Sequence, residues 1–347
     1  MDPRVKELAK KLGLTRRGDS LARVRRFALE QVQEVFAEVP VNRLSDLLRL
    51  VAAKLSIQLT FVRSDGDIRR IGQEHRKGLP GLNRMLHLDF LEGETEGVLL
   101  RRQSREVGER QYLAIIDARG PRRWRAYFTA WHELAHGLTA PPQIPLPGFR
   151  RSPSAEQKNR DPIERVVDDI AGRLAFYEPL FQPILEGAVR AEGGLTLTAI
   201  DRAREAVGPD VSFLSTAIAS LRLLSSQACL VEVDLGLKKR EEQSLDTSQQ
   251  LIPGLSAAPP EPKLRVRQVI RSDAIADHPI RLFPRMRVPS NSVLHSVFNG
   301  GSSGVVLSAD EDMSWWETSG GGSLPAQAVR VSAVYRGSYV YGLITPS

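Results

Sequence analysis

Residues 132–136 have the sequence HELAH, which places two imidazoles and a carboxylate within one short segment. On a helix, side chains four positions apart lie one above the other at about 6 Å, so both imidazoles can reach one metal ion. Glu133 leans toward the same side and can take a proton from a metal-bound water. The chain has only 6 histidines, and this spacing therefore favours a metal site over a chance pair.

A catalytic zinc ion normally has three protein ligands and one water molecule, so His132 and His136 need a third partner. Glu164, on the nearest downstream acidic helix, follows His136 by 28 residues (164 − 136) and is the predicted third ligand. Asp168 lies four residues later on the same helix face and is predicted to accept the far N–H of a ligand histidine. The alternatives on this segment are a solvated acidic face or ligation by Glu156, Asp161 or Asp169.

These residue types suit the hydrolysis of a peptide bond. A zinc ion polarises a carbonyl and lowers the pKa of its water toward about 7, and Glu133 would act as the general base. Zn²⁺ is the expected cofactor, although another divalent ion such as Mn²⁺ suits the same ligands. The sequence does not identify the group that stabilises the oxyanion. The possible donors Tyr127, Tyr177, His75 and His87 are each better explained as core aromatics or ordinary histidines.

Helices and strands must position this cluster. Apolar periodicity predicts helices over residues 20–38 and 44–55, from about residue 121 through the HELAH motif, and from residue 162 to a stop at Pro179. Alternating runs predict strands at 57–62, near 97 and near 111. The prolines of residues 140–154 predict a loop. The sequence therefore predicts an α+β metallopeptidase domain over residues 1–180.

Three further segments follow. Residues 181–238 are expected to be helical, and the runs 195–207 and 211–224 fit either a helix-turn-helix-like pair or generic helix packing. Residues 239–263 are polar and proline-rich, which indicates a linker. Residues 264–347 contain short alternating runs, including 313–318, and predict a β-rich domain. That domain could be a ligand sensor, a substrate clamp or an oligomerisation surface. At most one of Trp315 and Trp316 should face inward.

Composition bounds the class of protein. Of the 347 residues, 41% are hydrophobic and 26% are charged, which is typical of a folded chain rather than a disordered one. The start is charged and no apolar run reaches about 18 residues, so we expect a cytoplasmic protein without membrane contact. The single cysteine, Cys229, lies in an apolar run and is expected to be a buried small hydrophobe. No pattern specifies an oligomeric state.

Basic residues outnumber acidic ones by 48 to 41, a net charge of +7, which makes a nucleic-acid partner conceivable. A solvated helix face is the favoured explanation, since the second run of the helical pair offers only Arg222 as a charge for reading bases. The clustered arginines are Arg16, Arg17, Arg23, Arg25, Arg26, Arg122, Arg123 and Arg125.

The motifs taken together resemble the ImmA/IrrE family of metallopeptidases over roughly residues 40–225. Residues 127–138, YFTAWHELAHGL, are similar to that family's Phe-Thr-x-x-His-Glu-x-x-His helix. Residues 163–177 are similar to its second helix, in which a ligand glutamate is followed by Asn or Asp four residues later and Ala seven later, here Glu164, Asp168 and Ala171. The chain departs from the pattern at Tyr127, where an arginine is common, at Trp131, where a small residue is common, and at the end of the second helix.

The resemblance implies a zincin-like, gluzincin-type fold with one catalytic zinc ion, followed by a helix-turn-helix-like segment. It also implies that the substrate is an XRE-type helix-turn-helix repressor, whose cleavage switches on stress-response or mobile-element genes, and that the last domain is a sensor. Two other hypotheses compete with this one. The chain could be a DNA-binding transcriptional regulator with a structural metal site, or an inert sensor or scaffold that retains the metal ligands.

Overall fold

The structure is a computed structural model that mixes helices and strands, as the sequence predicts. It divides into two compact units, residues 1–184 with 203–216 and residues 185–202 with 217–347. The described residues are 2–15, 18–75, 79, 95–103, 108–139, 147–151, 161–238, 240–243, 260–275, 278, 280–300, 302–318, 321–337 and 339–347.

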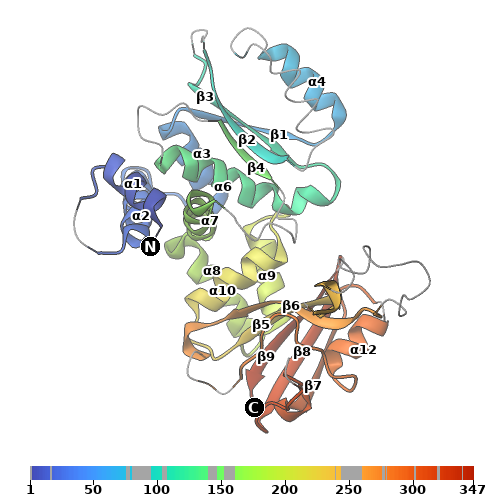
Figure 1. The fold of residues 1–347 in the computed structure, drawn as a ribbon. Coiled ribbons are helices and arrows are strands. Elements are labelled where there is room, and N and C mark those ends of the chain that lie inside the picture. The colour runs from blue at the N-terminus through green and yellow to red at the C-terminus, as the bar shows by residue number, and fades with distance from the viewer. Residues whose placement is uncertain are drawn as a thin grey trace. The chain divides into compact units, whose positions relative to one another are not determined.

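The described strands of the first unit form a four-stranded sheet in the order β1-β3-β2-β4 (Figure 1). β3 runs parallel to β1 and antiparallel to β2, and β4 pairs antiparallel with β2. The bounds are β1 Ile57–Val62, β2 Thr95–Arg101, β3 Tyr112–Asp117 and β4 Pro147–Arg151.

β4 corrects a prediction, because it lies in the proline-rich segment 140–154 that was expected to be a loop. Pro147 is the first residue of β4, and β4 is the last strand in the sheet order. A proline can occupy the first residue of an edge strand because no ladder hydrogen bond needs its missing N–H. The prolines therefore limit this strand to one edge of the sheet without preventing it.

The helices predicted at 20–38, at 44–55, around the HELAH motif and from residue 162 are confirmed, while α1 and α4 were not predicted. α4 begins with a capping box between Ser64 and Asp67, and α1 is capped by Asp2, whose carboxylate accepts the N–H of Arg4. The bounds are α1 Pro3–Lys11, α2 Ser20–Glu38, α3 Leu44–Lys54, α4 Asp65–Glu74, η2 Gly120–Arg122, α6 Arg123–Thr139 and α7 Pro162–Leu174.

The segment after α7 is helical as predicted, but its first helix differs from the expectation. α7 ends at Leu174, and Pro179, which was expected to end it, lies in the first turn of the next helix. The first turn tolerates proline because its N–H groups have no partner within the helix. The bounds are α8 Glu178–Ala191, α9 Leu197–Val207 and α10 Phe213–Leu223.

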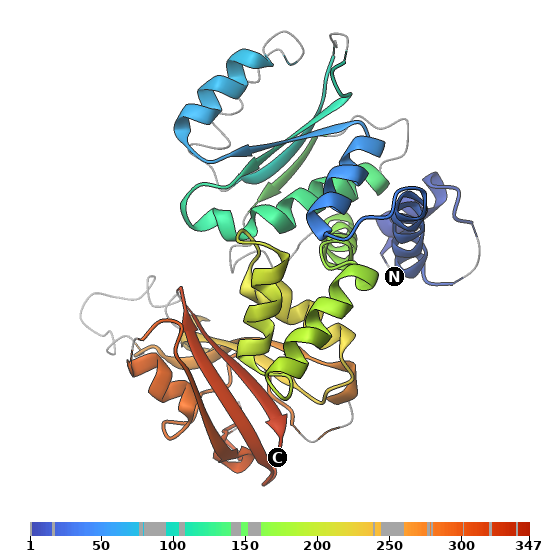
Figure 2. The ribbon, with the colours of Figure 1, turned by 180° about the vertical axis from the view of Figure 1, so that it is seen from behind.

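Helices cover both faces of the four-stranded sheet (Figures 1 and 2). Ile68 and Ile71 of α4 pack with Val98, Leu113 and other strand residues in one apolar cluster. α6 lies on the opposite face, where a Cβ atom added to Gly137 would come within 2.8 Å of Ile57 Cδ1. The absence of a side chain at this position therefore lets α6 approach β1 closely.

Charged groups attach the start of α6 to the ends of the strands. The fully buried carboxylate of Asp117, at the end of β3, accepts hydrogen bonds from Arg119 (2.8 Å) and Arg122 (2.6 Å). Arg122 also donates to the carbonyl of Thr95 (3.3 Å). Burial alone would raise the pKa of Asp117, but these hydrogen bonds outweigh it and lower the pKa. The cluster therefore holds β2, β3 and α6 together.

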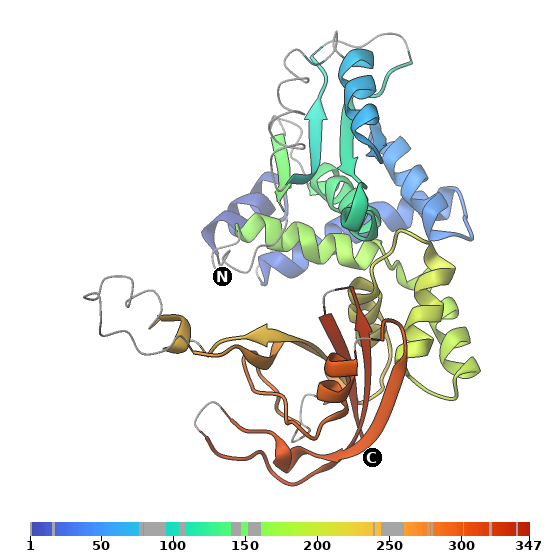
Figure 3. The same cartoon turned by 90° about the vertical axis from the view of Figure 1, so that its right-hand side faces the viewer.

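The described strands of the second unit form a five-stranded antiparallel sheet in the order β6-β5-β9-β8-β7. α12 packs against β8 and β9 (Figure 3). Cys229 is buried in this unit's core, as predicted. The bounds are β5 Cys229–Gly236, β6 Lys263–Arg271, η3 Asp273–Ile275, α12 Val293–Gly300, β7 Val306–Asp312, η4 Met313–Trp315, β8 Ala328–Arg336 and β9 Tyr339–Pro346.

Several details of the second unit differ from the sequence-based division. β5 pairs with β6 and β9, although the division ended the helical segment at residue 238 and so placed this strand with the helices. Residues 313–315 form a 3-10 helix instead of a strand. Trp316 is fully buried while Trp315 is 40% exposed, so only one of them faces inward, as expected. Most of the expected linker, residues 244–259, lies outside the described residues.

Within the part of the chain that the structure describes, no helix combines the length and the hydropathy required to span a bilayer.

We expect Asp117→Asn to lower the free energy of unfolding by about 3 kcal/mol at pH 7, because it removes the fully buried charge that pairs with the half-buried guanidinium groups of Arg119 and Arg122. The folded-state pKa of Asp117 is lowered, so its stabilisation is complete above the unfolded pKa of about 3.9 and is lost as the pH falls through the folded pKa. Denaturant unfolding at pH 7 and near pH 2 should therefore show that the deficit shrinks in acid. Asp65→Asn is the control, since Asp65 pairs with the same Arg119 from an exposed position. An equal loss for both variants would contradict the anchoring role.

Candidate metal centre

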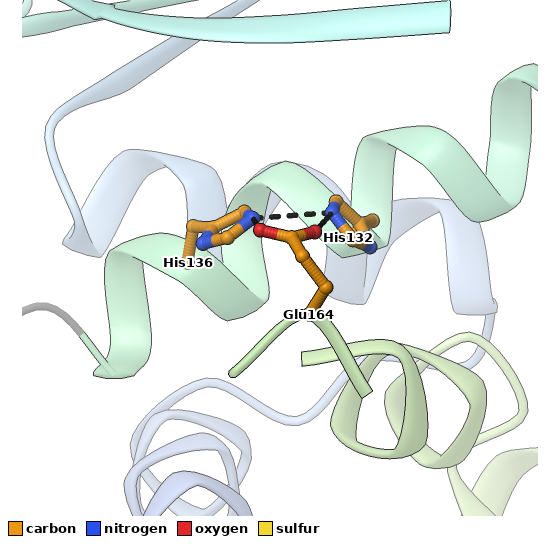
Figure 4. Close-up of side chains that lie close together, drawn as sticks. All are labelled: His132, His136 and Glu164. Atoms are coloured by element: carbon orange, nitrogen blue, oxygen red, sulfur yellow. Dashed lines mark hydrogen bonds and ion pairs between the residues drawn. The ribbon is translucent and has the colours of Figure 1, made fainter. Parts of the chain in front are cut away.

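The structure brings His132, His136 and Glu164 together, from α6 and α7, as the sequence predicts (Figure 4). Their ligand atoms all lie within 4.8 Å of one another. The Nε2 atoms of His132 and His136 are 3.1 Å apart. One carboxylate oxygen of Glu164 lies 3.2 Å from His132 Nε2 and the other lies 3.4 Å from His136 Nε2. Three donors on two helices therefore converge on one point.

Helix geometry explains how each side chain reaches this point. His132 and His136 are one turn apart on α6 and both are buried. Glu164 is in the first turn of α7, where the positive end of the helix dipole favours a carboxylate. α7 begins at this place because the carboxylate of Asp161 accepts the N–H of Ile163 (2.9 Å), and Pro162 is the first helical residue.

Asp168 takes the predicted place behind the cluster. Its carboxylate lies 2.9 Å from His132 Nδ1, on the side of the ring opposite to Glu164. When the Nδ1–H donates to Asp168, the lone pair of Nε2 is directed toward the shared point. Asp168 therefore orients one of the two imidazoles, which are themselves in edge-to-face contact with ring centroids 4.8 Å apart.

The lesser alternatives for the third ligand have other partners. Asp161 caps α7 and pairs with Arg4 at 2.8 Å. Asp169 pairs with Arg25 and with Arg173, each at 3.3 Å. Glu156 lies outside the described residues. Of the acids that the structure describes on this segment, Glu164 is therefore the one that reaches the Nε2 atoms of both histidines.

The electrostatics of the cluster favour an ionised carboxylate beside the imidazoles. Burial by itself would raise the pKa of Glu164, but hydrogen bonds from His132 and His136 hold it well below its usual value. The side chain of Glu164 keeps 34% of its exposure, so the cluster is not closed off from solvent. Two imidazole nitrogens and a carboxylate form a donor set that suits divalent transition metals. The residues present therefore fit a metal ion.

Glu133 points toward the sheet, where it is fully buried beside β2. A Cβ atom added to Gly97 would come within 2.9 Å of Glu133 Oε1 and within 2.5 Å of Thr129 Cγ2. No side chain fits between this strand and the carboxylate. The pairing of β2 with β4 is also irregular between Thr95 and Gly97. Sequence reasoning missed Gly97, although a glycine inside an expected strand is the known signal for such a close approach.

The side chains considered as oxyanion donors have structural partners. The hydroxyl of Tyr127 donates to the carbonyl of Ala175 (2.6 Å), and burial raises its pKa. Tyr177 packs edge-to-face on Phe36. His75 Nδ1 lies 3.2 Å from Arg102 Nη2, and burial is the main cause of its lowered pKa. His87 lies outside the described residues.

Several of the clustered arginines neutralise acids of this chain. Arg25 pairs with Asp169 at 3.3 Å, Arg122 with Asp117 at 2.6 Å and Arg125 with Glu96 at 3.0 Å. Arg16 and Arg17 lie outside the described residues. These pairs use the positive charge within the fold, which weakens the case for a nucleic-acid surface built from the clusters.

Comparison of the chain with protein-family models and with curated proteins finds no match. The assignment of this site therefore rests on its residues and their geometry.

We expect the purified protein to bind one divalent ion and His132→Ala and Glu164→Gln to lose it, because two ligands remain in each variant. Asp168→Asn should weaken binding by about 10-fold to 100-fold, since it disturbs the imidazole without removing a ligand. Asp169→Asn is the matched control on the same helix and should bind as the wild type does. Competition against a chromophoric chelator measures all four variants. Unchanged affinity in Glu164→Gln would contradict the ligand set.

Proposed function

We propose that the first unit is a zincin-like domain of a zinc-dependent endopeptidase. The observation that carries the proposal is the convergence of His132, His136 and Glu164, with Glu133 directly following His132 on the same helix. A zinc ion bound there would polarise the scissile carbonyl and lower the pKa of the attacking water.

The number of ligands favours a catalytic site over a structural one. Structural zinc sites are normally closed by four protein ligands, whereas catalytic sites keep one position for water or substrate. Among the described residues, the cluster contains three ligand side chains. This supports the enzyme over the alternative of a DNA-binding regulator with a structural metal.

Each residue of the site then has a separate role in the proposed reaction. His132, His136 and Glu164 hold the ion, and Asp168 keeps the His132 ring in the orientation that directs Nε2 toward it. Glu133 accepts a proton from the attacking water and later donates it to the leaving amine. Its burial removes competing water from around the carboxylate.

The proposed substrate class comes from the resemblance to the ImmA/IrrE family, and so does the proposed setting in the cytoplasm. On this proposal the enzyme makes a limited cut in an XRE-type helix-turn-helix repressor and so switches on stress-response or mobile-element genes. The same resemblance supports α9 and α10 as a helix-turn-helix-like pair and the second unit as a sensor.

Cleavage is tested in a lysate of the source organism by labelling the new protein N-termini that appear with the zinc-loaded full-length protein. Repressors encoded beside its gene are the first purified substrates to try. We expect Glu133→Gln to keep the metal and to lose at least about 100-fold of the cleavage rate, because it removes the general base alone. Equal cleavage by the variant would contradict the role of Glu133. If the wild type produces no new termini in either assay, the endopeptidase proposal fails.

We also expect Gly97→Ala to slow cleavage by displacing the carboxylate of Glu133. To isolate this contact, Gly97→Ala is compared with wild-type Gly97 in a Thr129→Ser background, which removes the Cγ2 methyl that the new Cβ would otherwise meet first. The turnover number should fall about 10-fold to 100-fold with KM and zinc affinity unchanged, because only the base has moved. Thr129→Ser alone serves as the reference. A double variant that turns over as fast as this reference would contradict the positioning role of Gly97.

A further inference from the structure

The second unit contains a pocket of about 140 Å³ that is remote in sequence from the metal ligands. Its walls come from the chain just before α12 and from the chain around the end of η4. Val288 and Pro289 are its buried lining residues, and Arg287, Asn291, Trp315 and Glu317 line it from exposed positions.

The walls of this pocket are fixed by the core of the unit. Trp316 and Met313 are buried in the core, which holds the neighbouring Trp315 in place. Asp312 caps η4 by accepting the N–H of Ser314 (2.7 Å). On the other wall, the N–H of Val288 donates to the carbonyl of Leu264 at 2.9 Å. The pocket is therefore formed before any ligand arrives.

Two opposite charges face this pocket without neutralising each other. Arg287 and Glu317 are partners in an antiparallel bridge, so their side chains start close together. Opposite charges in that position commonly form an ion pair. Neither Arg287 nor Glu317 has an ion pair or a side-chain hydrogen bond with any other residue that the structure describes. A cation and an anion are therefore both available to one small ligand.

The third feature is an aromatic surface. Trp315 is 40% exposed, and its indole is an apolar surface in a pocket whose other exposed groups are charged or polar. An exposed indole binds the apolar or cationic part of a ligand. A pocket of about 140 Å³ suits a ligand of small-metabolite size.

We propose that this pocket binds a small zwitterion of the α-amino-acid class. The ligand carboxylate pairs with the guanidinium of Arg287, its ammonium pairs with the carboxylate of Glu317, and its side chain lies on the indole of Trp315. Other ligand classes match less well. A simple anion such as phosphate meets the repulsion of Glu317, a simple cation meets that of Arg287, and a neutral sugar leaves both charges unpaired. This ligand site is independent of the peptidase proposal.

Calorimetric titration of the full-length protein with each of the twenty free amino acids, glycine betaine, glucose and inorganic phosphate tests the proposal. We expect at least one amino acid to bind saturably below about 10 mM, whereas glucose and phosphate do not. The affinity for that amino acid should change in each of four variants: Arg287→Gln, Glu317→Gln, Trp315→Phe and Trp315→Ala. The two charge variants should weaken binding at least about 10-fold, because each leaves one ligand charge unpaired.

Matched controls separate this pocket from the rest of the surface. Arg281→Gln removes an exposed arginine outside the pocket, and Trp124→Ala removes the 42% exposed tryptophan of the other unit, so both should bind as the wild type does. In a ¹H–¹⁵N spectrum, the indole signal that disappears in Trp315→Phe should shift on addition of the amino acid. The proposal is overturned if no amino acid binds, if phosphate or glucose binds instead, or if Arg287→Gln and Glu317→Gln leave the affinity unchanged.

Discussion

The contact between His132 Nδ1 and the carboxylate of Asp168, at 2.9 Å, joins the two helices that carry the candidate metal ligands. A buried imidazole can present either nitrogen, and its partner decides which one keeps a lone pair. Because Asp168 takes the Nδ1 side, Nε2 faces His136 and Glu164. Glu164 and Asp168 are one turn apart on α7, so a single helix supplies both a candidate ligand and the group that orients the imidazole of His132 on α6.

The sheet imposes the second constraint, because α6 must approach it closely enough to bury the whole HELAH motif. Side chains are absent where the approach is tightest, at Gly137 against β1 and at Gly97 on β2. The start of α6 is held by the buried carboxylate of Asp117 and its two arginines. A buried charge is tolerated there because hydrogen-bonded partners replace the lost hydration. The same fold that stabilises the unit therefore buries the Glu133 carboxylate against β2.

The two units differ in how their charged side chains are paired. In the first unit, buried or half-buried acids such as Asp117, Asp169 and Glu96 are matched by arginines of the same chain. In the pocket of the second unit, Arg287 and Glu317 are adjacent and yet have no ion pair within the described residues. Leaving two opposite charges without an ion pair costs little free energy where water can solvate them. Such a pair supplies charges that a ligand of matching dipole can use, which distinguishes this pocket from the ion pairs that hold the fold together.

The sequence by itself indicated the candidate metal ligands and the helices that carry them. Ligation needs particular residue types at helical spacing, and the separations between residues 132, 136, 164 and 168 are visible in a linear chain. The strand β4, the first-turn position of Pro179 and the 3-10 helix at residues 313–315 were decided by tertiary structure, since sheet pairing and core packing override local preference. The close packing of Gly97 against Glu133 and the pocket near Trp315 also follow from the tertiary structure. A close approach of backbone to carboxylate, or two walls joined by a single bridge, depends on contacts between segments that are distant in sequence.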